Sequence, residues 1–422
     1  MRAGAAALRW LRSFPGPVRT LAAAESARAT GFGFLLSVGV LYATRTVGLS
    51  AQQAGLAMTV AAACGTVAGP LAGRVADACG ARPTAVVLGV LQGAAALAYA
   101  VTANMAAFVA AASAAIAFHA ASETVYGALV ANTVEGPGRV RARAALHAVT
   151  NAGMSLGAAL GGLVLQLDSG TAYATAFLVC GALLAAAGLG CLRLPRTAPV
   201  PRPAHVPARG VLRDRPFVLF AALNVLLVMN DGLLTVVLPL WIAEHTAAPV
   251  SVYSAILVLN TLGIVLLQVR ASRGTARLAG GVRALRRSGV LLGACCAVFA
   301  LASGRPAGWA VAVLLAGAVV HLAGELLYSA GSWSLVFALA PEHAHGRYQG
   351  FFNASIQLGG MAAPVLGTTL VLGRAPYGWL AFALLFLLAG AAAPAVARLA
   401  CAREAGPRVP AGDGAVGDRG AA

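Results

Sequence analysis

The sequence predicts an all-α polytopic membrane protein of twelve transmembrane helices, arranged as two pseudo-symmetric six-helix bundles. Three observations support this. Hydrophobic residues make up 59% of the 422 residues and charged residues only 10%, and the mean hydropathy is +0.82. Apolar runs near the length of about 20 residues that spans a bilayer recur along the chain. A polar motif inside one run returns 202 residues later, which indicates a duplicated structure.

The predicted helices follow one another with short connections, so we expect no sizeable soluble domain. The twelve apolar runs fall at residues 21–46, 53–73, 83–103, 106–133, 144–166, 171–193, 216–243, 250–270, 288–303, 307–338, 349–372 and 376–399. The ninth of these runs is the shortest.

The basic residues orient the chain. All 30 are arginine, which is typical of a GC-rich bacterial genome, and the net charge is +17. With the amino terminus inside, 26 arginines fall on the cytoplasmic side, and only Arg45, Arg305 and Arg374 fall outside. Cytoplasmic loops carry such an excess of positive charge. We therefore expect a bacterial inner-membrane protein with both termini in the cytoplasm, and no nucleic-acid partner.

Residues 194–213 are rich in Pro and Arg and contain no long apolar run, so they separate the first six helices from the last six. This predicts an N-terminal bundle at 1–193, a cytoplasmic linker at 194–213 and a C-terminal bundle at 214–401. The tail, 402–422, is predicted to be disordered. The seven cysteines indicate neither a disulfide framework nor a zinc site, and no metal or cofactor is expected.

A His, a Glu four residues on and a Tyr three further occur at matching places in the two halves. The two sets are His119, Glu123 and Tyr126 on the fourth predicted helix, and His321, Glu325 and Tyr328 on the tenth. These offsets place all three side chains of a set on one helix face. A carboxyl group inside the membrane is costly and usually functional.

A third acid, in Asn230-Asp231-Gly232 on the seventh helix, stands where the first helix has Gly31-Phe32-Gly33. A carboxyl group in a low-dielectric interior can exchange protons near neutral pH, and histidine titrates in the same range. We interpret Glu123, Asp231 and Glu325 as a proton and substrate site. The two His residues would tune it, and the two Tyr residues and Asn230 would contact the substrate.

The alternative interpretation is structural: these His, Tyr and Glu side chains would form hydrogen bonds that join helices. Glu25 and Arg28, one helical turn apart on the first helix, are expected to neutralise each other near the membrane interface.

The loop after the second helix reads Gly73-Arg74-Val75-Ala76-Asp77-Ala78-Cys79-Gly80-Ala81-Arg82. It resembles the major facilitator superfamily pattern Gly-x-Leu-Ala-Asp-Arg-x-Gly-Arg-Arg/Lys, and the resemblance extends over nearly the whole chain. The pattern is matched at Gly73, Ala76, Asp77, Gly80 and Arg82, while Ala78 and Ala81 replace its two other arginines. The resemblance implies two halves that rock around a central site.

The resemblance also implies that Asp77 meets the start of the eleventh helix, around Gly346 and Arg347, and closes the cytoplasmic side. A helix dipole would stabilise an Asp there. The equivalent loop, 273–287, has no acidic residue, so the closure would be asymmetric. The alternative is a generic turn with a solvated Asp.

Two patterns of proton antiporters are partly present. The fifth helix carries four glycines spaced like the antiporter Gly-Pro-x-x-Gly-Gly, with Ala158 at the Pro position: Gly153, Gly157, Gly161 and Gly162. Ordinary close packing explains these glycines equally well. On the fourth helix, Glu123 stands where antiporters often carry an Arg four residues before a Gly.

The leading hypothesis is therefore a secondary transporter, not an enzyme, that exports small amphipathic or cationic compounds in exchange for protons. It rests on the fifth-helix pattern and on acids that lack a positive partner, because Arg28 is the one arginine expected in mid-membrane. The expected partners are a small molecule, protons and the lipid bilayer, and we expect a monomer. Alternatives are proton-coupled uptake by the same fold, a metalloenzyme using the His-x3-Glu helices, and a carrier-like sensor.

Overall fold

The computed structural model describes residues 14–134, 136, 138–167, 169–196, 210–373 and 377–404. Within these ranges all regular structure is helical. The long helices of the first half are α2 (Gly16–Arg45), α3 (Ala51–Cys79), α4 (Ala81–Tyr99), α5 (Met105–Thr133), α6 (Gly138–Leu167) and α7 (Gly170–Gly190), followed by the short turn η1 (Cys191–Arg193).

The second half follows the same plan. Its elements are the short turn η2 (Val211–Arg213), α8 (Arg215–Gly232), the π-helical turn η3 (Leu233–Val237), α9 (Leu238–His245), α10 (Ser251–Ala271), α11 (Leu278–Ala300), α12 (Ala307–Leu339), the turn η4 (Glu342–Ala344), α13 (His345–Gly367), the π-helical turn η5 (Thr368–Leu372) and α14 (Tyr377–Glu404). The α8–η3–α9 segment is one continuous rod. Eleven of the rods in the described ranges are long and apolar enough to cross a membrane, which confirms the predicted fold class.

Helix α11 differs most from its prediction. It begins at Leu278 and ends at Ala300, whereas the apolar run predicted residues 288–303. The difference arises because Arg283, Arg286 and Arg287 interrupt the hydropathy but not the helix. Their side chains are exposed on its surface, where charge carries little cost.

Local sequence signals set several helix ends. The Ser50 hydroxyl accepts the Gln53 N–H at 3.2 Å, and the Gln53 side chain accepts the Ser50 N–H at 2.9 Å, which forms a capping box at the start of α3. Asn104 and Ser169 cap α5 and α7 in the simpler way. Gly80 turns the chain between α3 and α4 with a φ of 96°, which favours glycine.

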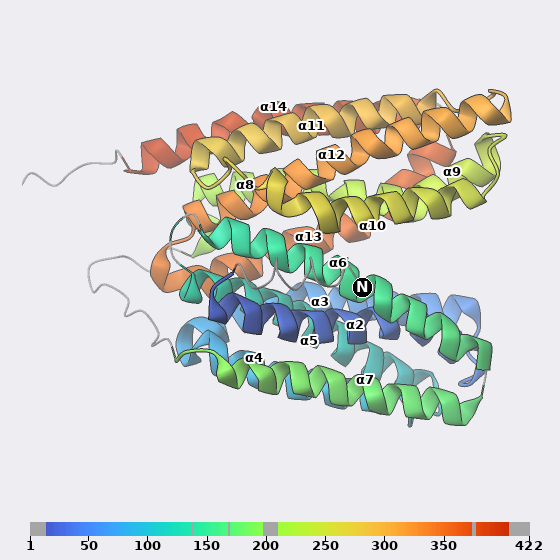
Figure 1. The fold of residues 1–422 in the computed structure, drawn as a ribbon, viewed down its shortest axis with the longest axis vertical. Coiled ribbons are helices and arrows are strands. Elements are labelled where there is room, and N and C mark those ends of the chain that lie inside the picture. The colour runs from blue at the N-terminus through green and yellow to red at the C-terminus, as the bar shows by residue number, and fades with distance from the viewer. Residues whose placement is uncertain are drawn as a thin grey trace, which may run out of the picture.

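The helices form two bundles that lie one above the other in Figure 1, α2–α7 below and α8–α14 above. Within the first bundle α2 packs on α6, α3 on α5 and α4 on α7. In the second, α8 packs on α13 and α14, and α11 on α12 and α14. The bundles meet through α3 and α13, α5 and α13, α6 and α10, and α6 and α12. Of the predicted linker, residues 197–209 lie outside the described residues, as does the tail from 405; α14 continues to Glu404, past the predicted end at 401.

Glycines on α6 allow its close approach to α2. A Cβ added to Gly157 would collide with the carbonyl oxygen of Thr30 and lie 2.7 Å from the backbone nitrogen of Phe34. Gly153 and Gly161 also face α2, whereas a Cβ on Gly162 would meet no atom within 4 Å. Three of the four glycines in the predicted antiporter pattern therefore pack α6 against α2.

The glycines give a matched test of this packing. Gly157→Leu should separate α2 from α6 and lower the stability of the purified protein by about 3 kcal/mol or more, as overpacking does. Gly162→Leu on the same helix should change it by less than about 0.5 kcal/mol. Thermal unfolding in detergent measures both, and equal effects of the two variants would contradict the packing described.

Candidate functional site

Asp77, in the last turn of α3, binds the start of α13. One carboxylate oxygen accepts the Gly346 N–H at 2.7 Å, and the other accepts the Arg347 N–H at 3.0 Å and its Nε–H at 3.3 Å. The carboxylate thus satisfies free N–H groups at a helix amino terminus, where the helix dipole also favours negative charge. The contact expected from the loop motif is present, and it joins the two bundles.

The same two helices are in close contact beyond Asp77. A Cβ on Gly73 would collide with the carbonyl oxygen of Gly346, and one on Gly69 would lie 3.5 Å from that of Gly350. Two more residues of the motif act nearby: Gly80 forms the turn, and Arg82 donates a hydrogen bond to the Leu192 carbonyl. We call the end that holds the α3–α4, α5–α6, α10–α11 and α12–α13 connections the arginine-rich end. The bundles are locked together there, and they diverge toward the other end (Figure 1).

A network of buried charges lies inside the first bundle. Arg28 on α2, only 2% exposed, donates to both carboxylate oxygens of Glu25, at 2.6 and 3.0 Å, and also to Glu123 on α5. Arg143 on α6 donates to the second oxygen of Glu123 at 3.0 Å. Thr150, also on α6, donates to Glu25 at 2.5 Å. Two acids and two arginines therefore join α2, α5 and α6.

The expectation that Glu123 lacks a positive partner is wrong, since it pairs with two arginines. Arg28 is buried inside the bundle, where it also pairs with Glu25 as expected. Arg143 lies one residue before the predicted fifth span, but α6 begins at Gly138 and carries Arg143 into the interior, 4% exposed. The sequence signal for this pairing is the general rule that an acid inside the membrane pairs with a neighbouring base.

His119 and Tyr126 lie on the same helix as Glu123, but the partner that both of them contact is Arg28. The His119 ring stacks on Phe32, with centroids 3.3 Å apart, and its Nδ1 lies 2.9 Å from an Arg28 nitrogen. The Tyr126 ring lies 5.3 Å from the Arg28 guanidinium carbon, and its hydroxyl accepts the Cys191 thiol at 3.4 Å. Both side chains therefore hold Arg28 in place.

Among the described residues, Arg143 carries the network to the second bundle. The Arg143 guanidinium carbon lies 3.9 Å from the ring centroid of Trp333 on α12. This is the geometry of a cation–π interaction, which strengthens when the cation is desolvated. The Nε and one terminal nitrogen of Arg143 are buried and make no hydrogen bond within the described structure.

The second bundle holds a different arrangement. Asp231 on α8 and Glu325 on α12 lie close enough to interact electrostatically, and Asn260 on α10 lies beside Glu325. Glu325 is 3.7 Å from Nδ1 of His321, beyond a hydrogen bond. Among the residues that the structure describes, neither carboxylate pairs with an arginine. Asp231 is exposed at the middle of its rod, whereas the Glu325 side chain is only 14% exposed.

The other predicted residues of this half make hydrogen-bond contacts within and between helices. Nε2 of His321 lies 3.3 Å from the carbonyl oxygen of Asn230, whose side chain donates back to Leu227 at 2.6 Å. The Tyr328 hydroxyl donates to Asn224 at 2.9 Å, and Asn224 donates to Ser355 at 2.8 Å. Asn224, which sequence reasoning missed, thus joins α8, α12 and α13.

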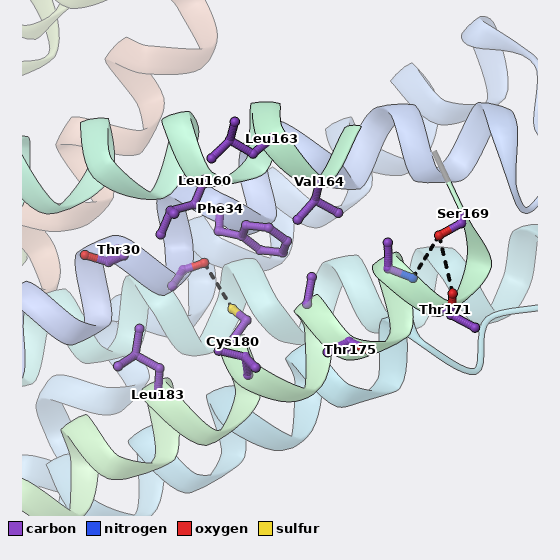
Figure 2. Close-up of a pocket in the computed structure, with 14 residues that line it drawn as sticks. Thr30, Phe34, Leu160, Leu163, Val164, Ser169, Thr171, Thr175, Cys180 and Leu183 are labelled. Atoms are coloured by element: carbon purple, nitrogen blue, oxygen red, sulfur yellow. Dashed lines mark hydrogen bonds between the residues drawn. The ribbon is translucent and has the colours of Figure 1, made fainter. Parts of the chain in front are cut away.

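An apolar cavity of about 650 Å³ is lined by none of these charged residues. It is bounded by α2, α6 and α7, and Figure 2 shows Phe34, Leu163 and Cys180 around it. The Cys180 thiol donates to the Gly31 carbonyl at 3.2 Å, which ties α7 to α2 at the floor. Because Leu163 is 58% exposed in a membrane-spanning helix, this cavity opens on the apolar outer surface. Across the described ranges, no three His, Cys, Asp or Glu side chains gather as metal ligands.

Comparisons agree with this architecture. The sequence profile of the Major Facilitator Superfamily matches residues 21–229. The human organic anion transporter MFSD10 superposes with a TM-score of 0.72 at 17% identity, covering 90% of this chain and 100% of that one. A bacterial homologue of the iron transporter ferroportin, outward-facing, gives 0.68 at 16% identity, covering 92% and 100%.

The Major Facilitator Superfamily transporter FucP, in its outward conformation, gives a TM-score of 0.72 at 16% identity, covering 90% of this chain and 98% of that one. A search of curated proteins finds no match. At these identities the superpositions establish the fold: the chain has the fold of Major Facilitator Superfamily transporters. The profile and the structural neighbours are all of transporters.

The Asp77 contact yields a direct test. Asp77→Asn removes the charge that faces the α13 amino terminus, an interaction of about 0.3–1 kcal/mol or more in a partly buried site. The separation of α3 from α13 should therefore become about two- to fivefold more frequent. Spin labels at Arg74→Cys and Glu342→Cys, with exposed Cys64, Cys79 and Cys401 replaced by Ser, measure it as a distance distribution.

Glu244→Gln is the control, because Glu244 is an exposed acid on α9 at the opposite end of the molecule. It should leave the distribution unchanged. An Asp77→Asn distribution that matches the parent would show that the carboxylate does not hold this end closed.

Proposed function

We propose that this chain is a secondary transporter of the Major Facilitator Superfamily that exports small amphipathic cations in exchange for protons. The match over residues 21–229 and the fold support the general class. The observation that carries the specific proposal is the Asp231–Glu325 pair, two acids that interact electrostatically and have no arginine partner in the described structure.

The chemistry of that pair suits exchange. Either a proton or an organic cation can neutralise an intramembrane carboxylate that has no arginine partner. The two ligands then compete for the same negative charge. Proton entry from the outside displaces the cation, which is how an inward proton gradient drives export.

The charge network of the first bundle has a structural role, in contrast to the exchange proposed for the acid pair. Its ion pairs join α2, α5 and α6, so this half moves as a unit when the bundles rock. Arg143 contacts Trp333 across the interface, and this contact separates if the arginine-rich end opens. The network therefore positions the first bundle against the pair of acids in the second.

The orientation follows from charge. Cytoplasmic ends carry more arginine, so we assign the arginine-rich end to the cytoplasm. The Asp77 contact with Gly346 and Arg347 then closes the cytoplasmic side, and the acid pair exchanges with the outside. The outward states named for two of the structural neighbours support this assignment.

Transport of an organic anion is the second candidate. Arg28 and Arg143 are two buried cations inside the first bundle, and one structural neighbour is named an organic anion transporter. An anion would have to replace Glu25 or Glu123, which already neutralise both arginines. Cation exchange at the unpaired acids is therefore the better-supported function.

Proteoliposomes with an imposed proton gradient test the choice. Ethidium, a cation, should be transported in the direction opposite to the protons. Fluorescein, an anion of similar size, should not be transported. Glu325→Gln and Asp231→Asn should each reduce ethidium-driven proton flux by roughly tenfold or more, because each removes a charge that both ligands need.

Glu244→Gln serves as the charge-matched control and should transport ethidium normally. Proton-coupled fluorescein flux that survives both acid substitutions would favour the anion candidate. Unchanged ethidium flux in both variants would remove the acid pair from the mechanism.

A further inference from the structure

A second cavity lies on the outside of the second bundle, at its arginine-rich end. Its volume is about 470 Å³, and it lies between α11 and α12. The residues that line it are Arg283, Arg286, Arg287, Val290, Leu291 and Leu327. None of them belongs to the charged sites described above.

The three arginines present unneutralised charge to this cavity. Their spacing of three and four residues places them on one face of α11, where like charges repel. Within the described part of the chain, none of the three makes an ion pair or a side-chain hydrogen bond. The sequence from 273 to 287 contains no acid that could supply one. An anion from outside the chain would relieve the repulsion.

The depth of the arginines matches the headgroups of a bilayer. Beyond Arg287 the apolar part of α11, Ser288–Ala300, spans about 20 Å at 1.5 Å per residue. The hydrocarbon core is about 30 Å thick. The arginines are therefore drawn to the boundary between hydrocarbon and headgroups, and cannot lie far out in water.

The other wall of the cavity is apolar. Val290 is 53% exposed, and Leu291 and Leu327 continue the surface toward the membrane interior. The cavity thus has three arginines on one side and an apolar wall on the other. A soluble anion would use only the first of these features.

We propose that this cavity binds an anionic phospholipid of the inner leaflet. Its phosphate accepts hydrogen bonds from the guanidinium groups, whose planar forks fit phosphate oxygens, and its acyl chain lies along Val290 and Leu327. The proposal is independent of the transported substrate, because the cavity lies on the outer surface of the bundle.

Native mass spectrometry of the full-length protein tests the site, with phosphatidylglycerol as the anionic lipid and phosphatidylcholine as the neutral one. The variant R283Q/R286Q/R287Q should bind phosphatidylglycerol roughly a hundredfold more weakly, about fivefold for each arginine removed. The control R270Q/R273Q/R277Q removes the same charge from the same region outside the cavity, and should stay within about threefold of the parent. If the cavity variant fails to fold, R286Q alone should show the fivefold loss.

Three outcomes would overturn the proposal. Equal losses in the two triple variants would mean diffuse attraction between arginines and lipid. Equal binding of phosphatidylcholine would remove the role of the phosphate charge. Displacement of the lipid by glycerol phosphate at an equal concentration would identify a site for a soluble phosphate.

Discussion

The ion pairs of Glu123 with Arg28 and Arg143 hold three helices of the first bundle against one another. Charges in a low-dielectric interior must be neutralised, and removing one partner of such a pair typically costs about 3–5 kcal/mol. Because the partners come from α2, α5 and α6, their positions are fixed together. The location of His119 and Tyr126 beside Arg28, and of Arg143 against Trp333, follows from this requirement.

The two halves share a motif but not its environment. When Gly31 is matched with Asn230, Arg28 corresponds to Leu227; when Arg139 is matched with Arg347, Arg143 corresponds to Phe351. Both positions that neutralise Glu123 are thus apolar in the second half, and Glu325 has Asp231 as its charged neighbour. A duplicated helix can therefore carry an acid paired with two arginines in one bundle and, within the described residues, an acid with no arginine partner in the other.

The helices could be predicted from the sequence, because each apolar run has about the length that spans a bilayer. The Asp77 contact could be predicted because the loop resembles a family pattern whose Asp meets the start of the eleventh helix. The pairing of Glu123 could not, because periodicity gives the face of a helix but not the neighbour that it meets. Arg143 was missed since α6 begins six residues before the predicted span. In the same way, the arginines of α11 lower the hydropathy of its first turns, so the predicted span began only at residue 288. Charged residues at helix ends are where hydropathy is least informative.

The most direct measurement compares the thermal unfolding of Glu123→Gln with that of Glu325→Gln in the same detergent. Glu123→Gln should lower the stability by about 3 kcal/mol, because Arg28 and Arg143 lose their shared carboxylate. Glu325→Gln should leave the stability unchanged or increase it, because it removes an acid that has no cation to pair with. A stable Glu123→Gln together with a destabilised Glu325→Gln would show that the fixed and the exchangeable charges have been assigned to the wrong bundles.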